Sequence, residues 1–175
     1  MRGARLRSAE RRFVGGMAGV MLGLVVASAG VAPAQAQQRP DWSAELWATE
    51  GGEQLVAVAY TREAGDEELV PALTVMCGDP LWLRYEPGLN GVDETDRSGQ
   101  TASFSFSFGQ RSIERVLQYE AMDGNWTTML EAGDELLAAL QAGKEVAVSG
   151  GELPEQVFSL RGATAAIRDV RRSCR

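Results

Sequence analysis

The sequence contains no histidine and only two cysteines in 175 residues. Without histidine the chain cannot build a Ser-His-Asp or Cys-His catalytic set, and the common histidine-containing zinc sites are excluded as well. The cysteines, Cys77 and Cys174, lie too far apart in sequence for a Cys-x-x-Cys redox motif or a metal cluster. A glycine-rich phosphate loop is also missing, because Gly15-Gly16 belongs to an apolar leader. No cofactor is therefore expected.

The amino-terminal segment is basic and then apolar. An uncharged run from Phe13 to about Ala34 ends in Ala34-Gln35-Ala36, the small-x-small pattern that signal peptidase accepts. We predict a signal peptide over residues 1–36 and a periplasmic or secreted chain, residues 37–175, with no membrane contact after cleavage. The alternative is an uncleaved anchor, because the run is nearly long enough to span a bilayer. Five arginines precede it against one acid, Glu10: Arg2, Arg5, Arg7, Arg11 and Arg12.

Positive charge is scarce in the predicted mature chain. Removal of residues 1–36 leaves 12 basic and 23 acidic residues, a balance that repels nucleic acid and anionic lipid. The last segment is the exception, because residues 161–175 hold five arginines and one aspartate. Arg168, Arg171 and Arg172 are therefore our candidate partner-binding residues, for another envelope protein or a cell-wall component. A solvated helix surface is the simpler interpretation of the same charges.

Short segments of period two, separated by turn-forming residues, predict strands and hairpins. The turns are predicted at Gly51-Gly52, at Cys77-Gly78-Asp79-Pro80, at Gly109-Gln110 and around Gly150-Gly151. The predicted strands are residues 42–49, 54–61, 69–76, 81–85, 101–108, 113–119, 145–149 and 156–160.

The segment "SFSFSF" alternates serine with Phe104, Phe106 and Phe108, so the three phenylalanines must point to one side of a strand. A buried core is the favoured interpretation, since burial of three such rings is worth several kcal/mol. An aromatic platform for sugars or bases is the alternative. The four tryptophans are likewise expected in the core or at its rim.

Two helices are predicted in the second half. Residues 134–142 place three leucines on one side and end at Gly143. After Gly162, residues at spacings of three and four form an apolar stripe that includes Cys174, with the arginines off it. The predicted fold is mainly β: an antiparallel β-sandwich or half-barrel of about eight strands with two short helices, the last at the C-terminus.

The two cysteines are predicted to form a disulfide, because an oxidising periplasm favours pairing of Cys77 with Cys174. Two independent buried thiols, or a thiol that joins two chains, are the alternatives.

Acidic residues are concentrated in two predicted loops, Asp66-Glu67-Glu68 and Asp93-Glu94-Thr95-Asp96. Their carboxylates have the chemistry to bind calcium or to supply the acid pair of a hydrolase. Neither loop has the ligand spacing of a calcium site, so solvated loops are the simpler interpretation.

The order of features resembles that of the VasI-like type VI secretion accessory proteins: an early tryptophan, a strand that ends at Cys77, "LWLRY", "RVLQYEAMDGNW", a leucine helix and "VFSLRGATAAIRDVRRSC". The ending is also similar to that of the invasion-associated locus B family, whose members are exported bacterial proteins. The resemblance implies a secreted β-rich domain and no transferable active site.

Three functions follow as hypotheses. The first is a non-enzymatic envelope-associated interaction or accessory domain. The second is a hydrolase or lyase that uses paired carboxylates, and the third is a small-ligand carrier with an aromatic interior. Convergent acids in a deep pocket favour the second, an apolar cavity behind Phe104 favours the third, and a filled core with an exposed patch favours the first.

Overall fold

The computed structural model describes residues 41–62, 69–88 and 99–174. The predicted signal peptide and both acidic loops, Asp66-Glu67-Glu68 and Asp93-Glu94-Thr95-Asp96, lie outside these residues. The described strands are β1 Ser43–Thr49, β2 Gly52–Tyr60, β3 Ala72–Met76, β4 Leu81–Glu86, β5 Thr101–Phe108, β6 Arg111–Glu120, β7 Asn125–Leu130, β8 Glu145–Gly150 and β9 Leu153–Ser159; the helices are α1 Glu135–Ala142 and α2 Ala163–Ser173.

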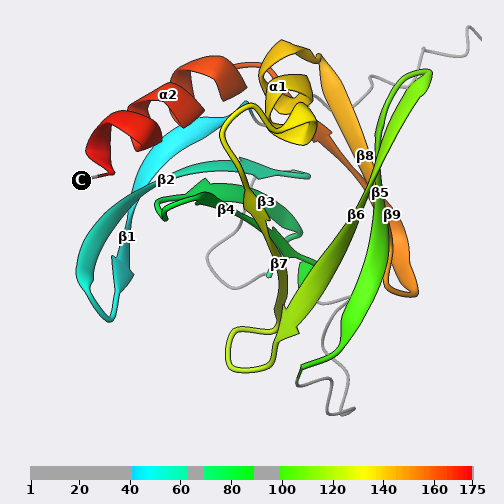
Figure 1. The fold of residues 1–175 in the computed structure, drawn as a ribbon, viewed down its shortest axis with the longest axis horizontal. Helices are drawn as coiled ribbons and strands as arrows, with labels where there is room; N and C mark the ends of the chain where they lie inside the picture. Colours follow the sequence, from blue (N-terminus) through cyan, green and yellow to red (C-terminus); the bar gives the residue numbers. More distant parts are fainter. Residues whose placement is uncertain (1–40, 63–68, 89–98, 175) are drawn as a thin grey trace, which may run out of the picture. The chain divides into compact units, whose positions relative to one another are not determined.

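The predicted fold class is confirmed. The strands form one antiparallel sheet in the order β1-β2-β3-β4-β7-β6-β5-β8-β9, curled into a half-barrel (Figure 1). The four predicted turns join β1 to β2, β3 to β4, β5 to β6 and β8 to β9. Gly52 and Gly109 have φ of 110° and 74°, the left-handed region that glycine reaches without steric cost.

β7 is the strand that the sequence pattern did not reveal. It lies between β4 and β6 and is hydrogen-bonded to both. Asn125, Trp126 and Thr127 are all buried in succession, so the segment has no period-two alternation. The strand therefore raises the number from about eight to nine.

The inner face of the half-barrel holds the hydrophobic core. Phe104 and Phe106 are fully buried and Phe108 is half-buried, which confirms that this aromatic stripe faces the interior. Phe104 packs against Trp126 and Tyr85, with ring centroids 5.2 and 5.7 Å away. Both helices contribute to the same core through Leu136, Leu137, Leu140, Ala163, Ala166, Ile167 and Val170.

The helix α2 packs mainly against β2, with further contacts to β1, β3 and α1. It begins after Gly162, whose φ is 88° and whose position leaves no room for a side chain, because a Cβ would lie 2.7 Å from the Trp42 carbonyl oxygen. The backbone N–H of Trp42 donates to the carbonyl of Arg161 at 2.8 Å. The start of β1 is thus fixed to the turn that leads into α2. Within the described ranges, no helix is both long and apolar enough to cross a membrane.

Candidate functional site

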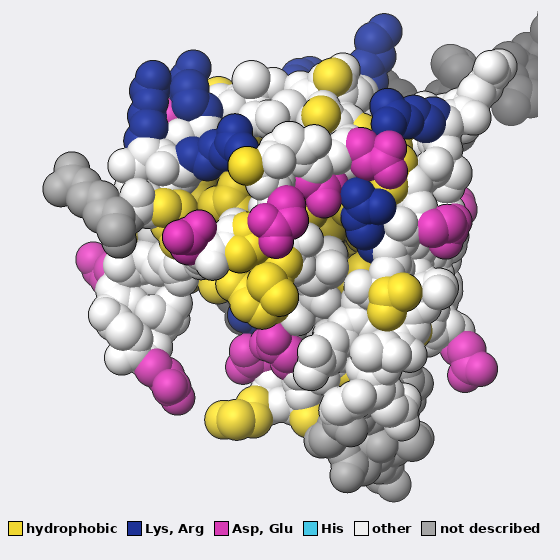
Figure 2. Space-filling view, viewed as in Figure 1, with side chains coloured by type: hydrophobic (Ala, Val, Ile, Leu, Met, Phe, Trp, Pro, Cys, Tyr) yellow, Lys and Arg dark blue, Asp and Glu magenta, His cyan; other side chains and the backbone are white. Residues whose placement is uncertain are grey.

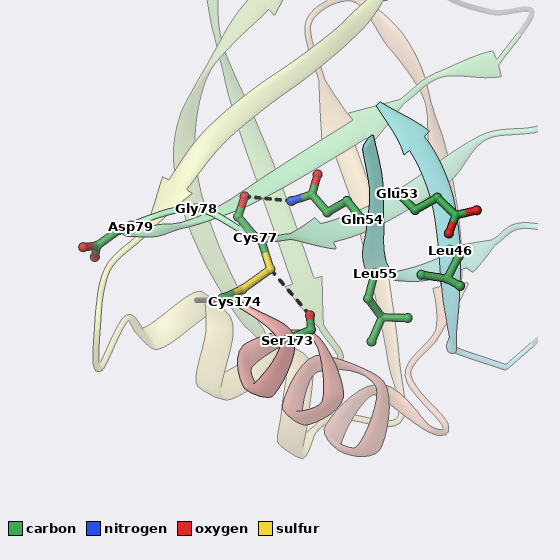
Figure 3. Close-up of a pocket in the computed structure, with 9 residues that line it drawn as sticks. All are labelled: Leu46, Glu53, Gln54, Leu55, Cys77, Gly78, Asp79, Ser173 and Cys174. Atoms are coloured by element: carbon green, nitrogen blue, oxygen red, sulfur yellow. Dashed lines mark hydrogen bonds between the residues drawn. A yellow bond between two sulfur atoms is a disulfide. The ribbon is translucent and has the colours of Figure 1, made fainter. Parts of the chain in front are cut away.

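The disulfide between Cys77 and Cys174 is present, as the sequence predicted, and no cysteine is free (Figure 3). Cys77 follows β3, and Cys174 is the C-cap residue of α2, with a Cα–Cα distance of 5.4 Å. The bond joins residues 97 apart in sequence and fixes the end of α2 to the sheet. Its sulfur atoms are partly buried beside the core, so the geometry gives the pair a structural role.

The three candidate arginines lie on the exposed side of α2. Arg168, Arg171 and Arg172 are all exposed, whereas the buried residues of the helix face the core. Figure 2 shows basic side chains gathered where α2 lies in Figure 1. Asp169 partly neutralises this surface, because its Oδ1 lies 3.3 Å from Arg168 Nε and 3.9 Å from Arg172 Nη1. The helix therefore presents a basic surface with one acidic residue inside it.

A cavity of about 730 Å³ lies beside the disulfide. Leu46 and Leu55, which pair across β1 and β2, form its apolar part, and Leu55 extends toward α2 (Figure 3). Gln54 Nε2 donates to the Cys77 carbonyl at 3.2 Å, so this polar group already has a partner. Two carboxylates, those of Glu53 and Asp79, also line this cavity at the end of α2, and they point away from each other (Figure 3).

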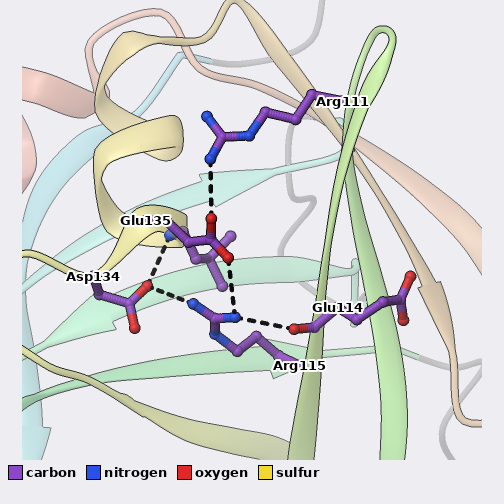
Figure 4. A network of polar contacts seen from close by, with 6 residues as sticks. Arg111, Glu114, Arg115, Asp134 and Glu135 are labelled. Carbon is purple, nitrogen blue, oxygen red and sulfur yellow. Dashed lines mark hydrogen bonds and ion pairs between the residues drawn. The ribbon is translucent and has the colours of Figure 1, made fainter.

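A network of ion pairs connects β6 to the start of α1 (Figure 4). Arg115 Nη2 lies 2.9 Å from Asp134 Oδ1, and the same oxygen accepts from the Leu136 N–H at 2.7 Å. Asp134 is thus the N-cap of α1, and Glu135 adds exposed ion pairs with Arg111 and Arg115. These acids stabilise the helix start and are already hydrogen-bonded, which assigns them to structure.

The outer face of the sheet carries a groove that the sequence analysis missed. Two adjoining cavities, of about 1020 and 270 Å³, share Met76, Arg84, Glu120 and Asp123 in their walls. The groove crosses β2, β3 and β4 and ends at the β6–β7 turn. The full lining consists of Trp47, Ala48, Thr49, Glu50, Gln54, Met76, Cys77, Trp82, Arg84, Glu86, Gly99, Glu120, Ala121, Met122, Asp123 and Thr127. We refer to it as the outer groove.

The apolar part of the outer groove is formed by tryptophan and methionine. Trp82 is opposite Met76 on β3 and Met129 on β7, so the three side chains lie in one row across the sheet. Met129 is 51% exposed and Met122, in the β6–β7 turn, is 95% exposed. Figure 2 shows hydrophobic side chains bordered by acidic ones over the region of β4 and β7.

The polar part of the outer groove is centred on Arg84. Its Nε lies 3.3 Å from Glu86 Oε1 and its Nη2 lies 3.3 Å from Asp123 Oδ2. Thr127 Oγ1 donates to Glu120 Oε1 at 3.0 Å. Burial raises the pKa of Glu86, the charge of Asp123 raises it further, and Arg84 opposes the shift.

A second set of contacts holds the far wall of the groove. Glu45 Oε2 accepts from Trp47 Nε1 at 3.3 Å and from the Tyr60 hydroxyl at 3.2 Å. Burial, followed by the charge and hydrogen bond of Glu45, raises the pKa of Tyr60 to about 12. Glu45 thus links the indole of Trp47 on β1 to the hydroxyl of Tyr60 on β2.

The described residues contain no group of three or more histidine, cysteine or acidic side chains placed to hold a metal ion. Three carboxylates of the outer groove are engaged: Arg84 pairs with Glu86 and Asp123, and Thr127 donates to Glu120. A sequence signal for the groove did exist, because Trp47 and Trp82 both occupy polar-side positions of period-two strands, where tryptophan is unexpected.

Comparison of the chain with protein-family models, with curated proteins and with solved structures found no significant match. The similarity to VasI-like and locus B proteins therefore stays a prediction.

Proposed function

We propose that the protein is a non-enzymatic, exported domain of the bacterial envelope that binds another envelope component through the basic side of α2. The observation that carries this proposal is the exposure of Arg168, Arg171 and Arg172 on a helix whose opposite side is fixed in the core. A rigid helix loses little conformational entropy on binding, and exposed arginines supply charge and forked hydrogen-bond donors. An anionic protein surface or an anionic cell-wall polymer has the complementary chemistry.

The packing of the interior favours this function over a ligand carrier. A Cβ at Gly151 would lie 2.7 Å from Phe104 Cζ, and a Cβ at Gly150 would lie 2.8 Å from Phe104 Cα. Phe104 itself contacts the rings of Tyr85 and Trp126. Phe104 is thus packed closely by the β8–β9 turn and by two rings, which favours a filled core, whereas a carrier needs an open interior.

Affinity capture from envelope extract tests the proposal. The oxidised mature chain is the bait, next to a variant with Arg168→Glu, Arg171→Glu and Arg172→Glu and a matched variant with lysine at the same positions. We expect the lysine variant to recover the same partners as the wild type and the glutamate variant to lose them, because lysine keeps the charge. Equal recovery by all three proteins would show that α2 is not the binding surface.

Folding of the variants needs its own control, since new acids near Asp169 repel one another at the C-terminal end of a helix. A third variant with glutamine at the three positions removes the charge without adding repulsion. Thermal unfolding by circular dichroism identifies any variant that is not folded. Loss of partners by a folded glutamine variant supports the proposal as strongly as loss by the glutamate variant.

A further inference from the structure

The outer groove and the basic side of α2 lie on opposite faces of the same strands. Trp47, Met76 and Trp82 occupy outward positions of β1, β3 and β4, while Ala57 and Val75, at inward positions of β2 and β3, join the core to which α2 contributes. Alternation along a strand sends successive side chains to opposite faces. The groove is therefore a separate surface, and an inference about it stands independently of the proposed function.

The groove is large enough for several side chains of a peptide. The larger of its two cavities, about 1020 Å³, reaches the upper end of the volume range of small-ligand pockets, and the second adds about 270 Å³ beside it. Its walls come from β-strands and from a tight turn, in which Gly124 N–H donates to the Glu120 carbonyl at 2.9 Å. The binding surface is thus preformed on rigid elements, which limits the entropy cost of binding.

The acidic charge of the groove favours a positively charged ligand. Four carboxylates line it, those of Glu50, Glu86, Glu120 and Asp123, against one cation, Arg84. Arg84 is held between Glu86 and Asp123, so its charge is compensated within the groove. The remaining negative potential attracts cations and repels the phosphates of nucleic acids and lipids.

The apolar residues of the groove favour a ligand that also carries long or apolar side chains. A lysine or arginine side chain stacks favourably over a tryptophan face while its charged end reaches a carboxylate. Methionines such as Met76 and Met122 adapt their shape to different apolar side chains. We infer that the outer groove binds a cationic peptide segment in which lysine or arginine residues alternate with apolar ones, as part of a partner protein.

Binding of a synthetic peptide to the oxidised mature chain tests this inference. The probe is a short, fluorescently labelled peptide that alternates lysine and leucine, and binding is measured by fluorescence anisotropy. Control peptides carry glutamine in place of lysine, or serine in place of leucine. We expect the first peptide to bind, both controls to bind at least about tenfold more weakly, and added salt to weaken binding. Equal binding of the glutamine peptide would overturn the inference.

Variants on the outer face locate the site. Trp82→Ala is expected to weaken binding about tenfold or more, because buried aromatic contacts dominate peptide recognition. Glu120→Gln, which keeps the hydrogen bond from Thr127, is expected to weaken binding a few-fold and to reduce its salt dependence. Glu114→Gln is the matched control, since Glu114 is on the same face of β6 as Glu120 but outside the groove. Binding that responds equally to Glu114→Gln and Glu120→Gln would overturn the assignment.

A second copy of the chain is the competing occupant, because its α2 is basic. Sedimentation of the mature chain distinguishes the two cases. If the chain self-associates, and both Glu120→Gln and Arg171→Glu abolish the association, the groove binds a second copy and the inference about a partner peptide is wrong. A chain that stays monomeric and still binds the lysine peptide supports the inference.

Discussion

The inner and outer faces of the β2–β4 region are made by alternate residues of the same strands, but they differ in chemistry. Inward residues such as Leu73, Leu83 and Tyr85 are fully or almost fully buried and aliphatic or aromatic. The outward face is mixed: Met76, Trp82 and Arg84 remain partly exposed, whereas Val56, Val58 and Thr74 are fully buried. The inner face thus supplies most of the stability, and the groove end of the outer face is available for recognition. A change on one face is therefore expected to leave the property of the other largely intact.

Two tryptophans on neighbouring strands provide the largest test of this difference. Trp126 points into the core from β7, whereas Trp82 lines the outer groove from β4. Trp126→Ala is expected to lower the free energy of unfolding by about 3–5 kcal/mol, because it leaves a cavity in a close-packed interior. Trp82→Ala is expected to cost only about 1 kcal/mol. Urea unfolding followed by circular dichroism measures both, and equal losses would refute the division between the faces.

Removal of the disulfide tests how much the attachment of α2 to the sheet contributes to stability. Cys77→Ser combined with Cys174→Ser is expected to lower the free energy of unfolding by about 2–4 kcal/mol, since the bond closes a long loop in the unfolded chain. Ser173→Ala is the control for a change at the end of the helix. Peptide binding by the outer groove should persist in the folded double variant. A variant as stable as the wild type would contradict the structural role of the bond.

The smallest expected effect is the contribution of Glu86 to the pH dependence of stability. Because burial raises the pKa of Glu86, the folded protein keeps this proton at pH values where the unfolded chain has released it. The stability of the wild type, relative to Glu86→Gln, should therefore fall as pH rises above the usual carboxyl range and level off above the raised pKa. Urea unfolding at a series of pH values measures this difference. A stability difference between the wild type and Glu86→Gln that does not change with pH would refute the assignment.

Local patterns were sufficient for most of the fold. The hairpins, both helices and the pairing of Cys77 with Cys174 were predicted because each depends on alternation, on turn residues or on a count of two cysteines. β7 was missed because a central strand with buried residues on both faces does not alternate. The placement of β7 beside β4 and of β8 beside β5 was also beyond prediction. Alternation shows which residues share a face, but it does not show which strands pair.

The two candidate sites also differ in whether the sequence alone could predict them. The basic surface of α2 was predictable, because all of its arginines lie on one short helix and their spacing fixes their side. The outer groove depends on the register between β1, β3, β4 and β7, which brings Trp47, Trp82 and Thr127 to one face. These residues lie far apart in sequence. Only the assembled sheet places them within one ligand's reach.

The hydrogen bond from the Trp42 N–H to the Arg161 carbonyl has a consequence for the time course of folding. A chain that emerges from its amino-terminal end can form the local β1–β2 hairpin early, but the Trp42 contact cannot form until Arg161 is available and most of the domain has appeared. Contacts over such long separations form slowly, since a large loop must close first. The β1–β2 hairpin is therefore attached to the turn before α2 only as one of the last events.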